Sequence, residues 1–524
     1  MMMVVRPRMA YLFIIVLSLA GTAIALLATS RYGSGLPSDA MRYIAFADNL
    51  LKGRGLIDYD QVRLLVFPPL FPGLLAVLSF VTGLDVFLVG WYLNIFLWGL
   101  NLFLTGLFLR QALSDLPLYF YLSLLVVFFS SSALLMHTSV LTEPLFLTFS
   151  LLLFFAGSAY GATRSLWAWG VMLGIGIGAS LLRWAGMGHI VTAGLVILWA
   201  WRHNWRAGLL HTGAFGVFAF APVTAWIYFY NYLPTGTLWG IPSKGNVFVL
   251  ENILQALRKM FYWFVPYRPL SSEGKWEALV VLFILLLVLL ILNRKQHWLA
   301  WGREYTRPLV LTASLFALIN FVSTALMAQT ADHRALSSDR YYALLLPSTL
   351  VFLSLTFHHL IRPHLPFPNR WINIGLLFFF GLWLLLPFNR LIKYIDRSLQ
   401  EGEAGYNIYN LRKYHESELI AQARVLLQRE PDAVLYSNIP APVWFFTRHL
   451  MTYMIPKRAE WSWDDFKENM SGWPYDKAGY VLWFEDDPFK IFYEPGDLYR
   501  VAEIHPVYRA ADGVLYYVSP RAQP

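Results

Sequence analysis

The sequence of 524 residues contains no cysteine and few charged residues. The absence of cysteine excludes disulfide bonds, thiolate metal sites and a cysteine nucleophile. Charged residues make up 14% of the chain, whereas soluble domains usually carry about 25%. The hydrophobic fraction is 57%, which is more apolar sequence than the interior of a soluble protein of this length can hold. The composition therefore predicts an integral membrane protein.

The sequence also lacks the usual signatures of nucleotide, metal and nucleic-acid binding. There is no P-loop and no His-Glu-x-x-His motif, and the glycines from Gly174 to Gly178 lie inside an apolar run where they suit helix packing. His358, His359 and His364 have no carboxylate partner nearby in the sequence. The net charge of +9 is spread over loops and forms no basic stripe. We therefore predict no cofactor, no metal and no nucleic-acid partner.

Apolar residues form runs of roughly 17 to 23 residues, the length that a helix needs to cross about 30 Å of hydrocarbon. The first run follows Arg6 and Arg8, is too long for the core of a signal peptide and lacks a clear cleavage site, so we expect a retained helix. The predicted spans are 10–29, 87–109, 116–135, 144–160, 166–182, 184–200, 208–230, 277–293, 308–328, 341–359 and 371–389.

The arginines and lysines of the short loops predict the orientation of these spans. They can all be cytoplasmic only if the apolar stretch 67–82 does not cross the membrane. Pro68, Pro69 and Pro72 interrupt helical hydrogen bonding at its start and leave too few residues to span. We therefore predict an interfacial or re-entrant helix within one long external loop.

The predicted fold is an all-α polytopic membrane bundle of about eleven transmembrane helices, followed by a small extracytoplasmic α/β domain. The transmembrane module covers residues 1–389, with external loops 30–86 and 231–276. Residues 390–524 change sharply in composition and form the soluble domain. Hydrophobic periodicity predicts a helix near 415–429 and strands at 433–436, 480–484 and 514–518 in that domain.

Charged and aromatic residues at the outer ends of the spans are the candidates for chemistry, because charge beside a membrane is costly and tends to be functional. The candidates are Asp39, Glu143, Arg183, His333, Arg340 and Tyr341. Each has a structural alternative: Ser38 or Asp39 would cap a helix, Glu143 would complement a helix dipole, and the others would lie at the interface. All six lie on the same predicted face of the membrane, which favours a shared site.

Several segments of the chain resemble the GT-C membrane glycosyltransferases, in the protein-mannosyltransferase and aminoarabinose-transferase-like branch. Residues 38–56 and 67–75 are similar to the first external loop of that branch, including an A-x-N-L-L-x-G-x-G stretch at 47–55 and a Pro-Pro-Leu motif. Later motifs of the branch have counterparts, in the same order, at 141–147, 182–186 and 339–347. Two departures, Ala40 in place of a second acidic residue and Phe67 in place of histidine, argue against a two-carboxylate or metal-assisted site.

The resemblance implies a GT-C-like fold and the transfer of a hexosyl or pentosyl group from a polyprenyl-phosphate donor. The acceptor would be a protein, lipid or glycan on the extracytoplasmic face of the plasma membrane. Asp39 would be the general base and Glu143 would orient hydroxyl groups. The lipid phosphate would contact Arg340 and Arg183, with His333 and Tyr341 in the same pocket. A phosphate leaving group is already a stable anion, so it needs cationic donors but no general acid.

Two other functions remain open from the sequence. A transporter or flippase for lipid-linked glycans would carry paired charges near the bilayer midplane and inverted repeats, and the sequence shows neither. A non-catalytic structural subunit would keep the fold, but its Asp39 would not face an open cavity.

Overall fold

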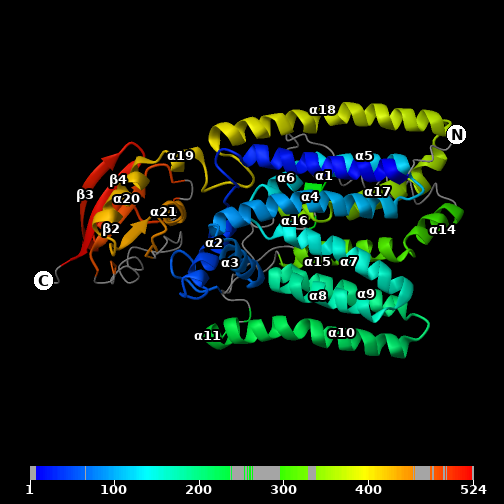
Figure 1. The fold of residues 1–524 in the computed structure, drawn as a ribbon, viewed down its shortest axis with the longest axis horizontal. Coiled ribbons are helices and arrows are strands. Elements are labelled where there is room, and N and C mark those ends of the chain that lie inside the picture. Colours follow the sequence, from blue (N-terminus) through cyan, green and yellow to red (C-terminus); the bar gives the residue numbers. More distant parts are fainter. Residues whose placement is uncertain are drawn as a thin grey trace. The chain divides into compact units, whose positions relative to one another are not determined.

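A computed structural model of the chain describes residues 7–64, 67–236, 295–327, 338–452, 477–487 and 492–521, with isolated positions between these ranges. The described chain is mostly helical, with one small sheet near the C-terminus (Figure 1). It divides into two compact units. The first unit consists of Met1–Ser30, Leu65–Phe71 and Gly90–Asp396, and the second of Arg31–Leu64, Pro72–Val89 and Arg397–Pro524.

The first unit is a bundle of apolar helices. Its helices, two of which extend a few residues into the second unit, are α1 (Pro7–Thr29), α4 (Val86–Ala112), α5 (Pro117–Phe128), α6 (Ser131–His137), α7 (Glu143–Thr163), α8 (Leu166–Leu182), η1 (Trp184–Gly186), α9 (Met187–Ala200), α10 (Trp205–Trp226), η2 (Ile227–Tyr232), α11 (Leu233–Thr235), α14 (Lys295–Glu304), α15 (Pro308–Met327), α16 (Arg340–Ala343), α17 (Leu346–Thr356), η4 (Phe357–Ile361), η5 (Arg362–His364) and α18 (Asn369–Glu401).

Within the described residues, five helices are long and apolar enough to cross a membrane, and two bent helix pairs raise this number to seven. The five are Arg8–Thr29, Val86–Ala112, Glu143–Thr163, Trp205–Thr235 and Asn369–Glu401. The chain is thus a multi-pass membrane protein. The predicted count of eleven is not confirmed, and the predicted span 277–293 and most of the loop 231–276 lie outside the described residues.

Two predicted spans have different bounds in the structure. The span predicted at 116–135 is broken into α5 and α6, which are bent by 51°. The break is at Ser130, whose hydroxyl accepts a hydrogen bond from Ala133 N and caps α6; serine competes in this way with the helical ladder. The helix predicted at 371–389 continues through Pro387 to Glu401 as α18, because the end of an apolar run does not by itself end a helix.

The core of the first unit lies around α7, which packs against α8, α9 and α15 (Figure 1). Phe154 of α7 packs between Phe108 of α4 and Phe316 of α15, with ring centroids 5.1 and 5.3 Å apart. All three rings are fully buried. Packing therefore holds α7, the helix that begins at Glu143.

The second unit combines two segments before α4 with the C-terminal domain. It contains α2 (Ser38–Leu51), most of α3 (Leu70–Thr82), α19 (Arg412–His415), α20 (Glu418–Arg429), α21 (Pro440–Thr447), α23 (Pro495–Leu498), β1 (Leu435–Ser437), β2 (Gly479–Phe484), β3 (Ala502–Ala510) and β4 (Gly513–Pro520). The strands that the structure describes form one sheet in the order β1-β2-β4-β3. β1 and β2 are parallel, and β4 is antiparallel to both β2 and β3.

The predicted helix near 415–429 and the three predicted strands of this domain are confirmed as α20, β1, β2 and β4. β3 was not predicted. It is an edge strand with Pro506 and a register shift in its middle, and most of its side chains are at least partly exposed. Proline is tolerated at a sheet edge. A strand that contains proline and is largely exposed lacks the alternation of apolar and polar residues by which a strand is predicted.

Candidate functional site

Two arginines from distant parts of the first unit meet at the carboxylate of Glu143. The Nη1 atom of Arg183 lies 2.6 Å from Oε1 of Glu143, and Nε of Arg340 lies 3.3 Å from the same oxygen. The Glu143 side chain is only 1% exposed, and those of Arg183 and Arg340 are 18% and 12% exposed. Three ionised groups with a net charge of +1 are therefore gathered at the first turn of an apolar helix.

Arg183 reaches this position because the chain turns sharply between α8 and α9. It has extended backbone angles between α8 and η1. Gly186 closes the turn against the carbonyl of Ala179, where a β-carbon would overlap the backbone. Only glycine permits such a close approach, so this residue fixes the geometry from which Arg183 points to Glu143.

Thr142 and Tyr341 complete the cluster. The hydroxyl of Thr142 accepts a hydrogen bond from Nη1 of Arg183 at 3.0 Å and donates one to Oε2 of Glu143 at 3.2 Å. Arg340 donates to the Tyr341 hydroxyl at 2.7 Å. The guanidinium carbons of Arg183 and Arg340 lie 5.2 and 4.8 Å from the centre of the Tyr341 ring. Both cations are thus oriented by neutral partners as well as by Glu143.

Two buried asparagines on α4, which sequence reasoning missed, fix the start of α7. Asn94 donates to the carbonyls of Ser139 and Leu141 at 2.6 and 3.1 Å. Asn101 donates to the carbonyl of Pro144 at 2.8 Å. These two residues are seven positions apart and lie on one face of α4. A polar pair at this spacing inside an apolar span was the available signal, because buried amides require partners.

Replacing Glu143 by glutamine is expected to destabilise the first unit by about 3 to 5 kcal/mol, because two buried cations would lose their counter-charge. Glu304→Gln is the matched control: Glu304 pairs with Arg307 at 2.8 Å, and their side chains are 24% and 34% exposed. A pair near the surface contributes about 0 to 1 kcal/mol. Unfolding of the purified protein in detergent measures both. Equal effects would show that the cluster is not held by charge.

The second unit contains the predicted base. Asp39 lies in the first turn of α2, and its side chain is half-buried. The prediction that Ser38 or Asp39 caps this helix was wrong, because the capping position is Pro37, whose carbonyl accepts the hydrogen bond of Met41 N at 3.2 Å. Arg42, which sequence reasoning missed, lies one turn after Asp39 and is also half-buried. The two side chains share one face of α2.

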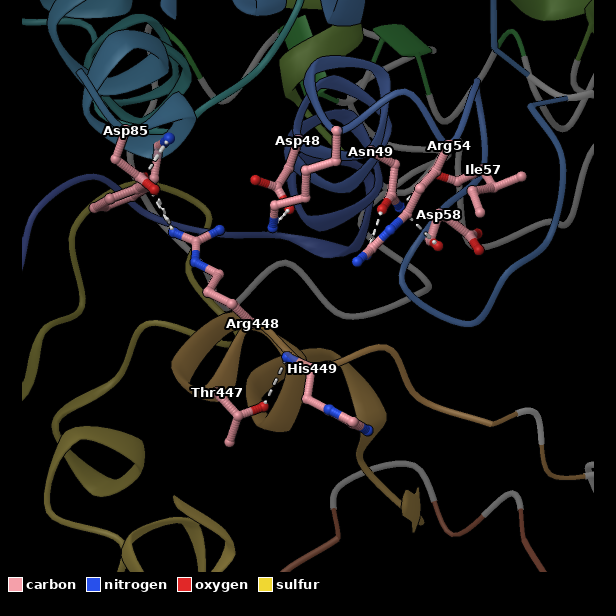
Figure 2. A network of polar contacts seen from close by, with 11 residues as sticks. Asp48, Asn49, Arg54, Ile57, Asp58, Asp85, Thr447, Arg448 and His449 are labelled. Atoms are coloured by element: carbon pink, nitrogen blue, oxygen red, sulfur yellow. Dashed lines mark hydrogen bonds and ion pairs between the residues drawn. The ribbon is translucent and has the colours of Figure 1, made fainter. Parts of the chain in front are cut away.

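The loop after α2 places Asp58 beside Arg42. Asn49 donates to the carbonyls of Ile57 and Asp58 at 2.9 and 3.2 Å (Figure 2). Asp58 is buried and lies 3.7 Å from Nε of Arg42. Burial raises the pKa of Asp58 to about 8, with Asp60 acting in the same direction and Arg42 in the opposite one. At neutral pH the loop therefore carries less negative charge beside Arg42 than its two aspartates suggest.

Of the six predicted site residues, Glu143, Arg183, Arg340 and Tyr341 come together in the first unit. Asp39 belongs to the second unit, and His333 lies outside the described residues. In the described part of the chain, no group of three or more His, Cys, Asp or Glu side chains is placed to hold a metal ion.

Comparison with known proteins gives a likeness in structure and none in sequence. No protein-family model and no curated protein matches the chain. The crystal structure of ArnT from Cupriavidus metallidurans in the apo state matches 96% of this chain and 97% of its own, with a TM-score of 0.57 and 12% identity. The chain shares the fold of ArnT.

ArnT bound to undecaprenyl phosphate matches equally well, over 96% of this chain and 98% of its own, with a TM-score of 0.56 and 12% identity. The arabinosyltransferase EmbB from Mycobacterium smegmatis matches 71% of this chain and 43% of its own at 12% identity, with a TM-score of 0.33. The likeness to ArnT covers the small C-terminal sheet as well as the helices, because it extends over nearly the whole of both chains. The predicted resemblance to the aminoarabinose-transferase-like branch is confirmed at the level of the fold.

Proposed function

We propose that this protein is a membrane glycosyltransferase that moves a sugar from a polyprenyl-phosphate donor to an acceptor on the extracytoplasmic face. The observation that carries the proposal is the pair of arginines held on Glu143 at the end of an apolar helix. This arrangement occurs in a chain with the fold of ArnT, a protein whose structure has been determined with undecaprenyl phosphate bound.

The chemistry of the arginine cluster suits a lipid phosphate. Guanidinium groups bind phosphate through parallel hydrogen bonds, and their positive charge stabilises the anion that remains when the sugar leaves. A partly buried site strengthens this attraction relative to bulk water. We assign the donor phosphate to Arg340 and Arg183, with Tyr341 orienting both.

Glu143 is assigned a different role from the one first predicted. Its carboxylate is buried and is approached by both arginines, so we propose that it holds them in place and contacts sugar hydroxyls only if the donor displaces an arginine. His333 stays a proposed member of the same pocket; it precedes the motif that carries Arg340 by six residues.

Asp39 is the proposed general base. A carboxylate in the first turn of α2 can accept a proton from an acceptor hydroxyl as the new glycosidic bond forms. The reaction then breaks the bond between the anomeric carbon and the phosphate oxygen, and the phosphate departs with that electron pair. Arg42, on the same face of α2, supplies positive charge beside the acceptor side of the reaction.

The test is to incubate the purified protein with a panel of undecaprenyl-phosphate pentoses and hexoses and to measure release of undecaprenyl phosphate. A transferase releases it from at least one donor, with the sugar passing to an acceptor or to water. A flippase in liposomes would move the intact donor across the bilayer without breaking this bond, and that result would favour the transporter.

The proposed topology can be tested with single cysteines, because the chain has none of its own. Asp115 and Ala511 are both exposed. An Ala511→Cys variant in intact cells should react with an impermeant maleimide, because the C-terminal domain is proposed to face outward. Asp115→Cys should react only after lysis. The opposite labelling pattern would reverse the proposed orientation.

A further inference from the structure

The short segment that leads into α2 is bound by a loop of the C-terminal domain. The segment consists of residues 32–36, and we call residues 402–411 the clamp loop. Both belong to the second unit, although more than 360 residues separate them in the sequence. Asp39 follows the end of the segment by three residues, so whatever holds the segment also fixes the start of the helix that carries the proposed base.

Asn410 makes the first set of contacts. Its amide nitrogen donates to the carbonyl of Tyr32 at 2.6 Å and to that of Ser34 at 3.0 Å. Its amide oxygen lies 2.8 Å from Nε2 of His415, which fixes the amide in one orientation. The residue is 1% exposed. The amide nitrogen thus holds the segment at two carbonyls, while His415 holds the amide oxygen.

Asn407 makes the second set. Its amide oxygen accepts the backbone N–H of Leu36 at 3.0 Å and that of Asn410 at 2.9 Å. The carbonyl of Leu36 accepts the N–H groups of Ile408 and Tyr409 at 3.3 and 3.2 Å. The last residue before Pro37 is therefore bound through both of its backbone polar groups.

Gly35 shows how closely the segment and the clamp loop approach each other. A β-carbon at this position would overlap the carbonyl oxygen of Ala404. The clamp loop and the segment are therefore in backbone contact, and a side chain at position 35 would push them apart.

The chain that follows α2 is also bonded to the C-terminal domain. Met451 N donates to the carbonyl of Tyr59 at 2.9 Å. Arg448 pairs with both oxygens of Asp85 at 3.0 Å, just before α4 (Figure 2). α2 is thus bounded before and after by segments that the C-terminal domain holds.

We propose that Asn407 and Asn410 are positioning residues for Asp39, and that the clamp loop is a structural part of the active site. This inference rests on the proposed function. A base must lie within hydrogen-bond reach of the proton it removes, and a displacement of about 1 Å can lower a rate by about 10². The asparagines never touch substrate; they act by fixing where α2 begins.

The test compares Asn410→Ala with Asn438→Ala. Asn438 is the matched control, because it is equally buried and bonds to both backbone groups of Phe484 inside the C-terminal domain. Asn410→Ala should lower the turnover of an undecaprenyl-phosphate sugar by about 10². Its affinity for undecaprenyl phosphate should be unchanged, since that contact is assigned to the arginines. Hydrogen exchange of residues 32–41 should accelerate in Asn410→Ala and not in Asn438→Ala.

A conservative variant separates positioning from folding. Asn407→Asp keeps the oxygen that accepts the N–H of Leu36 and loses the bond that the amide nitrogen donates to the carbonyl of Gly402. It should therefore retain more turnover than Asn407→Ala, which loses both. Equal losses in Asn410→Ala and Asn438→Ala would trace the effect to general instability and overturn the inference. Unchanged turnover in Asn410→Ala, with a large loss in Asp39→Asn, would also overturn it. Unchanged turnover in Asp39→Asn would instead contradict the assignment of the base.

Discussion

An Asp39→Asn variant is expected to fold and to bind undecaprenyl phosphate normally while losing turnover by roughly 10² to 10⁴, the usual contribution of a general base. Asparagine has the size of aspartate but cannot accept the acceptor proton. Asp39 does not occupy the capping position of α2. The substitution therefore removes no helix cap, and the interaction of the Asp39 charge with the helix dipole contributes about 0.3 to 1 kcal/mol.

Asp48→Asn on the same helix is the control. Asp48 pairs with Lys52 at 2.6 Å, one turn apart near the surface (Figure 2). Such a pair contributes about 0.3 to 0.5 kcal/mol, so this variant should keep the turnover of the parent. Turnover is measured with whichever donor of the panel the parent protein consumes. Parental turnover in Asp39→Asn would remove Asp39 from the mechanism.

An Arg340→Gln variant is expected to bind undecaprenyl phosphate about 10- to 150-fold more weakly, because a hydrogen bond between charged groups contributes about 1.5 to 3 kcal/mol. The substitution leaves the shorter contact between Arg183 and Glu143, at 2.6 Å, in place. The buried carboxylate therefore keeps a cation beside it, and the fold should survive. Binding is measured directly with undecaprenyl phosphate in detergent micelles or nanodiscs.

Arg202→Gln serves as the comparison. Arg202 follows α9, whereas Arg183 precedes it, so the two lie toward opposite ends of that helix. Its guanidinium lies over Trp199, 4.5 Å from the ring centre. Loss of this arginine should leave lipid-phosphate binding unchanged. If the two variants weaken binding equally, the effect is general electrostatic attraction, and the assignment of Arg340 to the phosphate is wrong.

The dependence of α2 on the clamp loop gives the C-terminal domain a part in the proposed active site. A domain with no recognisable motif suggests an accessory that could be removed. In the structure, the backbone of the segment before α2 finds its partners in Asn407, Ile408, Tyr409 and Asn410. Polar groups deprived of such partners in a buried position cost about 1 to 3 kcal/mol each. Removal of the domain should therefore disturb the proposed base itself.

The sequence by itself determined the class of the protein and most of its helices. Apolar runs of membrane-crossing length are a local property, since the bilayer requires each span to satisfy its own backbone hydrogen bonds. For this reason the predicted run 166–182 coincides with α8, and the run 144–160 lies within α7. The same local logic predicted β2 and β4 from their alternating apolar residues. It also predicted that Glu143, Arg183 and Arg340 lie at span ends on one face of the membrane.

Only the tertiary structure decided which of these residues meet and what holds them. Arg183 and Arg340 are 40 and 197 residues from Glu143, and their contacts depend on how α7, α8 and α16 are arranged. The sequence does not show which backbone groups Asn94, Asn101, Asn407 and Asn410 bond, because the partners belong to distant segments. Local sequence specifies which groups must be satisfied; the packing of distant segments determines which groups satisfy them.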